Sequence, residues 1–457
     1  MTALAGTCRP HLDANVVRLA REIRAEVAEA LAARGAVDKE SDRVDEAARM
    51  DTTRRLVARA LDQRVASVLA SGGSVPAAGH ERAVADLVIA MLFGLGLLQL
   101  FVDDPSVENI DVNGADRAYI TYADGRKECV GPVAENDDEL VAIIRGAGAR
   151  FGLAERRFDS AQPELDLRLP DGSRLSAVMS VTEHPVIDIR RHRLHDHTLG
   201  DLVALGMLDD ELASFLGAAV RAKRNLLVSG AMNAGKTTLL RALAAEIPSY
   251  ERIVTIEPAL ELGLDRQSDR HPDCVAMEAR LPNIEGVGAI SMAQLVRRSL
   301  RMNATRVIVG EVLGDEVIPM LNAMSQGRSG SMATIHADSS AGVFRRIAAY
   351  AVQAPERLPL EATNLLIAGS IHFVVHVDLG DAAAMGQRAT GPGPRLRHVA
   401  SVREVVDAEG AMIVSNEIWK PGPDGCARPA TPLRDVTAVA LAAAGHDSRR
   451  FARGRSW

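Results

Sequence analysis

The chain has 457 residues, of which 47% are hydrophobic and 25% charged, and its formal net charge at pH 7 is −7. The length predicts two or three domains, and the apolar fraction indicates a globular protein with substantial cores. The negative charge argues against a protein that coats nucleic acid without specificity, although it leaves room for a local basic groove.

We expect residues 1–76 to form a helical segment. Residues 12–70 are rich in Ala, Arg and Glu, and apolar residues such as Val16, Ile23 and Val27 recur at helical spacing. Residues 71–76 read Ser-Gly-Gly-Ser-Val-Pro, which indicates a joint. Two roles stay open for the segment: a cap on the following domain, or a surface for a partner.

An almost wholly apolar stretch spans residues 87–102. It is shorter than the ~20 residues that cross a bilayer, and two glycines and a glutamine interrupt it, so we expect a buried helix and a turn. Residues 1–10 lack the apolar core of a signal peptide, which predicts a cytoplasmic protein. The four cysteines lie far apart and form no C-x-x-C, which favours reduced thiols over zinc or disulfides.

Residues 77–192 are expected to form an α+β domain. Residues 107–112 and 118–122 have the composition of short strands, and residues 165–190 that of strands around a Pro-Asp-Gly turn. A polar linker, residues 193–198, should follow. Histidines 192, 195 and 197 stand in and beside it at a spacing that fits no standard metal-ligand set.

Residues 199–420 alternate short apolar runs with helical stretches. This order predicts right-handed crossovers and an α/β fold with a mainly parallel sheet, whose functional residues gather at the carboxyl ends of the strands. Residues 421–457 are expected to be a partly disordered tail. The strand candidates are residues 225–229, 252–256, 306–309, 332–335 and 372–377, with residues 399–405 and 411–419 as candidates for edge strands.

A phosphate-binding loop stands between the first of these strands and a helix. Residues 230–237 read Gly-Ala-Met-Asn-Ala-Gly-Lys-Thr, a complete G-x-x-x-x-G-K-[ST] motif. Glycines let the backbone curl so that its N–H groups face phosphate oxygens, and the helix that follows adds its positive dipole end. The motif predicts ATP binding by Gly230, Asn233, Ala234, Gly235, Lys236, Thr237 and Thr238, with Lys236 reaching the β/γ-phosphates and Thr237 binding Mg²⁺.

Acidic and histidine side chains follow three other strand candidates. Glu311 ends an apolar strand beside the loop, where a carboxylate can hold Mg²⁺ through water or polarise the attacking water. Glu257 ends another strand and is a second candidate for orienting water. His336 follows residues 332–335, where it is either structural or a sensor of the γ-phosphate.

The sequence resembles the type II/IV secretion ATPase family, in particular the CpaF-like branch that powers Tad/Flp-type pilus assembly, over about residues 90–415. The phosphate loop carries the resemblance together with a Thr-Ile-Glu box that ends at Glu257, a Val-Gly-Glu box that ends at Glu311, and a histidine box around His336. Further matching stretches are residues 107–114, 166–174, 278–280, 283–286 and 300–302.

The resemblance implies a RecA-like motor domain behind a flexible linker and an N-terminal domain, assembled as a homo-hexamer on the cytoplasmic face of the membrane. It implies an integral-membrane platform protein as partner. It also implies arginines that approach the γ-phosphate, with a planar guanidinium suited to phosphoryl transfer. The candidates are Arg280 and Arg301, whose flanking residues also match, and, less specifically, Arg168, Arg174 and Arg190.

Two departures from the family pattern leave an alternative open. Pro258 stands where an acid usually follows Glu257, and Arg328 stands where a histidine is common. They favour a nucleotide-binding scaffold or regulator with little turnover, whereas the intact Lys236, Thr237 and Glu311 favour hydrolysis. A DNA-translocating conjugation ATPase is the third hypothesis, and the acidic balance makes nucleic acid an unlikely partner. A small-molecule kinase would leave the N-terminal domain unexplained.

Overall fold

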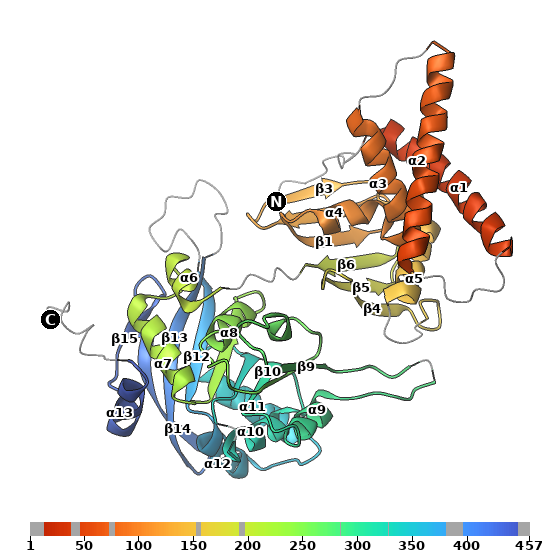
Figure 1. The fold of residues 1–457 in the computed structure, drawn as a ribbon. Coiled ribbons are helices and arrows are strands. Elements are labelled where there is room, and N and C mark those ends of the chain that lie inside the picture. Colours follow the sequence, from red (N-terminus) through yellow and green to blue (C-terminus); the bar gives the residue numbers. More distant parts are fainter. Residues whose placement is uncertain are drawn as a thin grey trace. The chain divides into compact units, whose positions relative to one another are not determined.

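The computed structural model describes residues 13–37, 46–72, 78–151, 157–191, 197–283, 285–327, 329–380 and 396–446. The chain divides into two compact units, Met1–Arg193 and Leu194–Trp457 (Figure 1). The histidines at 192 and 195, Arg328 and the last residues of the expected tail lie outside the described residues.

Three helices form one layer of the N-terminal unit: α1 (Ala14–Val37), α2 (Glu46–Ala70) and α3 (Ala78–Phe93). Their shared core contains Val16, Ile23 and Leu87, so the helical periodicity predicted for residues 12–70 is confirmed. Because α3 packs with α1 and α2, the expected boundary at residue 76 falls inside this layer. The apolar stretch is the end of α3 and two short helices, η1 (Gly96–Leu98) and α4 (Gln99–Asp103), as expected for a buried helix and a turn.

An antiparallel sheet forms the other layer of this unit, with the strand order β3-β2-β1-β6-β5-β4. Helix α5 (Asp137–Phe151) packs against it through Leu140 and Ile144. Arg21 and Arg24 of α1 form ion pairs with Glu139 of α5, so the helical layer is fastened to the sheet layer. The strands are β1 (Val107–Asn113), β2 (Ala118–Tyr122), β3 (Lys127–Val130), β4 (Glu164–Arg168), β5 (Arg174–Val178) and β6 (Val186–Arg190).

The C-terminal unit is built on a nine-stranded mixed sheet with the order β15-β14-β13-β12-β7-β11-β10-β8-β9. The six strands from β12 to β9 are parallel, and β13, β14 and β15 are antiparallel, so the prediction of a mainly parallel sheet is confirmed. The strands are β7 (Leu226–Gly230), β8 (Ile253–Glu257), β9 (Cys274–Glu278), β10 (Arg306–Val312), β11 (Met332–His336), β12 (Phe373–Gly380), β13 (Leu396–Glu409), β14 (Met412–Pro421) and β15 (Ala427–Pro429).

Helices cover both faces of this sheet because its parallel strands are apolar on both sides. Leu226 and Val228 of β7 belong to the core on one face, and Leu227 belongs to the core on the other. Figure 1 shows α6, α7, α8 and α13 over the first face and α9, α10, α11 and α12 over the second. The helices are α6 (Leu199–Ala204), α7 (Asp210–Arg221), α8 (Lys236–Ala244), α9 (Met292–Ser299), α10 (Val317–Ser325), α11 (Gly342–Gln353), α12 (Leu360–Ser370) and α13 (Asp435–Ala443), with the short η2 (Leu264–Arg266).

Two sequence-based expectations are corrected by the structure. Residues 421–446, expected to belong to the tail, extend the sheet through β15 and return through α13, where Leu441 enters the same core as Phe215 of α7. The cysteines also differ from expectation: Cys274 and Cys426 are free thiols, whereas Cys129 on β3 is disulfide-bonded. The prediction that all cysteines are reduced is therefore wrong for Cys129. No helix among the described residues is long and apolar enough to span a bilayer.

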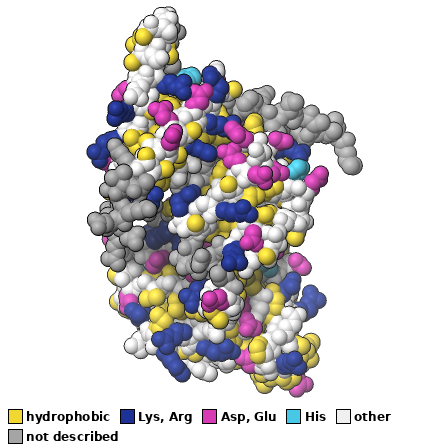
Figure 2. Space-filling model, turned by 90° about the vertical axis from the view of Figure 1, so that its right-hand side faces the viewer, with side chains coloured by type: hydrophobic (Ala, Val, Ile, Leu, Met, Phe, Trp, Pro, Cys, Tyr) yellow, Lys and Arg dark blue, Asp and Glu magenta, His cyan; other side chains and the backbone are white. Residues whose placement is uncertain are grey.

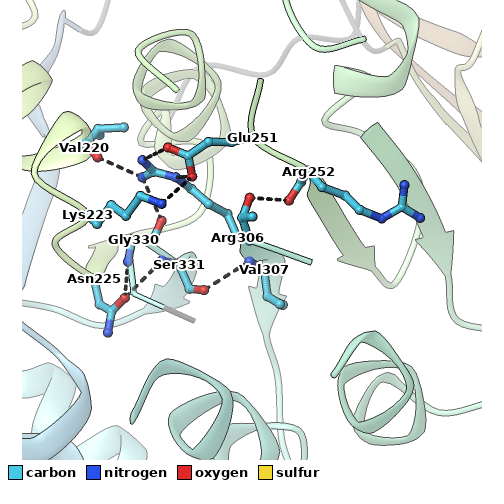
Figure 3. A network of polar contacts seen from close by, with 10 residues as sticks. Val220, Lys223, Asn225, Glu251, Arg252, Arg306, Val307, Gly330 and Ser331 are labelled. Atoms are coloured by element: carbon cyan, nitrogen blue, oxygen red, sulfur yellow. Dashed lines mark hydrogen bonds and ion pairs between the residues drawn. The ribbon is translucent and has the colours of Figure 1, made fainter. Parts of the chain in front are cut away.

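A buried polar network fixes the amino ends of the central strands (Figure 3). Arg306, at the start of β10, is fully buried and donates to both carboxylate oxygens of Glu251 at 2.9 and 2.8 Å. The same guanidinium donates to the carbonyl oxygens of Val220 and Gly330. The side chain of Asn225, just before β7, accepts from the N–H groups of Gly330 and Ser331 at 2.8 and 3.0 Å. The network thus holds the loop before β11 against β7 and β10.

We predict that Glu251→Gln lowers the free energy of unfolding by about 3 kcal/mol, because it leaves the buried Arg306 charge without its partner. Urea unfolding followed by tryptophan fluorescence measures this, since Trp419 is buried in the core of the C-terminal unit. The exposed pair of Arg221 and Glu246 provides the control: Glu246→Gln should lose less than about 1 kcal/mol. Equal losses in the two variants would contradict a dominant role for the buried pair.

The same pair predicts an acid dependence. Burial alone would raise the pKa of Glu251, but the hydrogen bond and charge of Arg306, with Lys223 nearby, bring it below its ordinary value of 4.5. A depressed folded-state pKa means that this stability is present above the unfolded-state pKa and is lost as pH falls through the folded-state pKa. Wild-type stability should therefore fall more steeply below about pH 4.5 than that of Glu251→Gln.

Candidate functional site

The predicted phosphate loop occupies the carboxyl end of β7. The strand ends at Gly230 and α8 begins at Lys236, so the loop joins a buried central strand to a helix N-terminus as the motif requires. Lys236 and Ala234 are buried, whereas Met232 at the tip of the loop is 69% exposed. Thr237 and Thr238 stand in the first turn of α8, partly exposed.

Backbone geometry explains both glycines of the loop. Gly230 has φ +156°, and a Cβ there would lie 2.3 Å from the carbonyl oxygen of Val377 on the neighbouring β12. Gly235 has φ +97°, in the left-handed region, and Asn233 enters that region as well with φ +61°. Left-handed residues within a tight loop turn successive N–H groups toward one concave side, which suits an anion.

Lys236 folds back over the loop from the start of α8. Its ammonium donates to the carbonyl oxygens of Gly230 and Ala231 at 3.2 and 2.9 Å. It also lies 3.1 Å from Nδ1 of His336. An ammonium group can only donate, so Nδ1 must accept, and His336 is the neutral tautomer that carries its proton on Nε2.

His336 connects Lys236 to Glu311. Its Nε2 lies 2.6 Å from a carboxylate oxygen of Glu311, and both side chains are about a third exposed (32% and 29%). The contact with Lys236 follows from the register, because His336 at the end of β11 pairs with Gly230, where the phosphate loop begins. The structure therefore brings together three residues that the sequence nominated separately, in the order Lys236, His336, Glu311.

A β-bulge directs Glu311 to this place. Val309 pairs with Ala333 but Val312 pairs with Ile335, so two residues of β10 stand opposite one residue of β11. Bulges of this kind re-aim a side chain and are common beside active sites. The carbonyl oxygen of Gly310 accepts from the hydroxyl of Thr334 at 2.6 Å, which holds the bulge in shape.

Glu257 is buried against the bulge and is not exposed at the site. It is 1% exposed and accepts hydrogen bonds from the Thr255 hydroxyl and from the N–H groups of Glu261 and Leu262 at 2.7–2.9 Å. Burial raises its pKa, although these three hydrogen bonds oppose the rise. A Cβ at Gly310 would lie 2.9 Å from Cγ of Glu257. Glu257 therefore anchors the turn that follows β8 and requires glycine in the Val-Gly-Glu box.

The two arginines with matching flanks are both exposed. Arg280 follows β9 and donates through Nε to the carbonyl oxygen of Gly288, across a hairpin closed by two backbone hydrogen bonds with Ile290. Figure 1 shows this hairpin as a long arm that projects from the unit between β9 and α9. Arg301 stands in the turn after α9. Within the described part of this unit, neither arginine forms a hydrogen bond or ion pair with Lys236, His336 or Glu311.

Three further arginine candidates form a row across the sheet of the N-terminal unit. Arg168 of β4 pairs in register with Arg174 of β5, and Arg174 pairs with Arg190 of β6. Paired residues share a face of the sheet, so three cations stand on adjacent strands, an arrangement that like charges disfavour unless an anion is near. Asp166 lies 3.8 Å from Arg174 and offsets part of this charge.

Comparison with known proteins identifies the family. The sequence profile of the type II/IV secretion system proteins matches residues 94–404, more than half of the chain. This chain belongs to the type II/IV secretion system protein family. It is 32% identical over 330 residues to a Mycobacterium tuberculosis protein named "Putative conjugal transfer protein Rv3659c", an alignment that covers 70% of this chain and 87% of the relative.

Other members of the family include VirB11 proteins. The type IV secretion system protein VirB11 of Brucella suis is 30% identical over 316 residues, covering 63% of this chain and 85% of the relative. The solved structure of the Brucella suis VirB11 ATPase in complex with sulphate covers 70% of this chain and 96% of that chain, with 26% identity and a TM-score of 0.35.

The site of this secretion-family chain fits a nucleotide on its own geometry. The loop at residues 230–237 leaves no room for a Cβ at Gly230, carries left-handed backbone at two residues, and presents Lys236 at the start of α8. Thr237 and Glu311 offer the oxygen donors that Mg²⁺ prefers. Arg397 of β13 also contacts the loop: its Nε donates to the carbonyl oxygen of Asn233 at 3.0 Å. No sequence motif signals this contact, because the two residues are 164 positions apart.

We predict that Gly230→Ala abolishes nucleotide binding and lowers the free energy of unfolding by about 2 kcal/mol or more, because the new Cβ meets the backbone of β12. Gly369→Ala on α12 is the matched control: no heavy atom lies within 4 Å of a Cβ there, and alanine should stabilise the helix by up to about 1 kcal/mol. Calorimetric titration with ADP and urea unfolding check both variants. Unimpaired binding by Gly230→Ala would contradict the loop assignment.

Proposed function

We propose that this chain is a Mg²⁺-dependent ATPase that converts ATP and water to ADP and phosphate. The proposal places it in the CpaF-like branch, powering pilus assembly or protein secretion through a membrane platform. The observation that supports it best is the contact of Lys236 with His336 and of His336 with Glu311 beside a complete phosphate loop. A phosphate loop alone would bind nucleotide. The linked carboxylate adds a group for hydrolysis.

Nucleotide phosphates compete for Lys236 in this proposal. Its ammonium is held by two loop carbonyls and a neutral imidazole, and doubly charged phosphate oxygens are stronger acceptors than any of these. When Lys236 moves to the β/γ-phosphates, Nδ1 of His336 loses its donor. His336 then reports phosphate occupancy to Glu311 through Nε2, which is the sensing role expected for the histidine box.

Glu311 orients the attacking water. The water oxygen forms a bond to the γ-phosphorus as the bond from that phosphorus to the β–γ bridging oxygen breaks, and the proton of the water passes to Glu311 or to the phosphate. The hydrogen bond from His336 keeps the carboxylate in place. Mg²⁺, when bound by the Thr237 hydroxyl and through water by Glu311, neutralises charge on the phosphate oxygens.

We further propose that the C-terminal unit is a RecA-like motor in a homo-hexamer. The row of Arg168, Arg174 and Arg190 is well suited to an anion, and it lies just before the linker to the motor. Arg280 and Arg301 are exposed, as a residue offered to a neighbouring subunit must be. In this proposal both sets approach the γ-phosphate in the ring, and the chain works at the cytoplasmic face of the membrane beside an integral-membrane partner.

A second candidate, a DNA-translocating conjugation ATPase, is favoured by the name of the Mycobacterium tuberculosis relative. On the face seen in Figure 2, Lys and Arg side chains alternate with Asp and Glu, and the described residues of that face form no broad basic surface. The net charge of −7 also weighs against DNA as the substrate. We therefore prefer a protein cargo, and the test below includes DNA.

The test is steady-state ATP hydrolysis by the purified protein with Mg²⁺, with the mass of the assembly measured on the same samples. We expect Lys236→Ala to abolish binding and hydrolysis together. Glu311→Gln should bind ATP with nearly wild-type affinity but lose at least about 100-fold in turnover, because it keeps the shape and loses the base.

Three outcomes would contradict the proposal in different ways. Tight ATP binding without turnover in any assembly state would favour the scaffold or regulator. Pro258→Glu, which restores the acid that usually follows Glu257 in the family, would then be the substitution to test for recovered turnover. Turnover that rises several-fold with added DNA would favour the conjugation motor. Wild-type turnover in Glu311→Gln would remove Glu311 from the chemistry.

A further inference from the structure

Arg397 reaches the phosphate loop from a strand that the loop motif does not include. It stands near the start of β13, where it pairs with Leu379 of β12, two residues beyond the point at which Val377 of β12 pairs with Gly230. From there its Nε donates to the carbonyl oxygen of Asn233 at 3.0 Å. The antiparallel edge of the sheet therefore touches the nucleotide loop directly.

The stem of Arg397 also covers the second glycine of the motif. A Cβ at Gly235 would lie 3.2 Å from Cδ of Arg397 and 3.5 Å from Cε of Met207. Met207 is itself tied to β13, because its carbonyl oxygen accepts from the N–H of Val399 at 2.8 Å. The left-handed Gly235 is thus enclosed by one arginine stem and one methionine, both fixed by β13.

We propose that Arg397 is a positioning residue that holds the phosphate loop in its nucleotide-binding shape. A peptide unit is planar, so the carbonyl of Asn233 and the N–H of Ala234 point in opposite directions. By holding the carbonyl outward, Arg397 keeps that N–H on the inner side of the loop, where it now makes only a long 3.4 Å contact with Ala231. Asn233 is a non-glycine residue with φ +61°, a less common backbone conformation that the hydrogen bond from Arg397 helps to maintain.

The inference rests on the proposed nucleotide function and deepens it. Lys236 holds the carbonyls of Gly230 and Ala231 from inside the loop, and Arg397 holds the carbonyl of Asn233 from outside. A phosphate group can displace the hydrogen bonds of Lys236 to the loop carbonyls, because Lys236 is the residue that binds the phosphate. It does not displace the hydrogen bond of Arg397, so this outer support persists through nucleotide binding and release.

Two substitutions separate the directed hydrogen bond from simple charge. Arg397→Lys keeps the positive charge but puts a methylene at the position of Nε. Arg397→Met keeps the apolar stem but has neither the positive charge nor the N–H donor. We expect both to weaken ADP binding about five- to tenfold, the value of one lost hydrogen bond, and to raise KM for ATP equally. The value of kcat at saturating ATP should change less than about twofold, since bound phosphates restore the loop.

Hydrogen exchange of the nucleotide-free protein tests the support without any ligand. Peptides that contain residues 231–236 should exchange faster in both variants than in the wild type, while peptides from β7 stay unchanged. Arg428→Met is the control, because Arg428 is a half-exposed β15 residue whose side chain pairs with Asp424. It should leave exchange and ADP affinity as in the wild type.

The result that overturns the inference is distinct from failure of the proposed function. Normal binding and normal exchange in both variants would overturn it. Weak binding by Arg397→Met with normal binding by Arg397→Lys would also overturn it, in favour of charge attraction. If the wild type itself binds no nucleotide, the proposed function fails, and unchanged exchange of residues 231–236 would then overturn the inference separately.

Discussion

The packing of β7 between β11 and β12 is the constraint on which the site depends. Gly230, the last residue of β7, pairs with His336 on one side and with Val377 on the other. That pairing forbids a side chain at position 230, brings His336 to the phosphate loop, and puts β13 within reach of Asn233. The loop motif is therefore one part of a site built by five adjacent strands, in the order β13-β12-β7-β11-β10.

The opposite end of the same strands carries the buried Arg306 and Glu251 pair. Buried ion pairs are weak evidence for net stability, but removing one partner leaves an uncompensated charge. The network also has a geometric effect, because its side chains form hydrogen bonds with the backbone of Gly330 and Ser331, six and five residues before His336. A β-strand is stiff and its side chains alternate between its two faces. The position at which β11 begins therefore determines the position and direction of the His336 side chain at its end.

Sequence patterns predicted the elements with local signals. Central strands such as β7 and β11 are short apolar runs buried on both faces, and α1 has a regular apolar stripe, so each was visible without tertiary information. Strands β3 and β9 were missed because their residues are only half-buried and carry no clear alternation. The boundary expected at residue 76 falls inside the helical layer, because a glycine-rich joint can separate two helices that still pack together.

The site was predictable as a set of residues but not as an arrangement. Lys236, Glu311 and His336 each follow a recognisable strand, yet their contact depends on the bulge in β10 and on strand order. Glu257 has the same local pattern as Glu311 and nevertheless is buried, because the N–H groups of Glu261 and Leu262 in the turn after β8 bind its carboxylate. Arg168, Arg174 and Arg190 were indistinguishable in sequence because only the antiparallel register reveals that they form one row.

A crystal structure with Mg²⁺ and a non-hydrolysable ATP analogue would show whether this site binds nucleotide as proposed. We expect the β- and γ-phosphates to occupy the loop at residues 230–237, and the Lys236 ammonium to leave Nδ1 of His336 for a phosphate oxygen. We also expect His336 to remain bonded to Glu311 and Arg397 to Asn233. Phosphates bound elsewhere, or a Lys236 that keeps its contact with His336 in the nucleotide complex, would contradict the proposal.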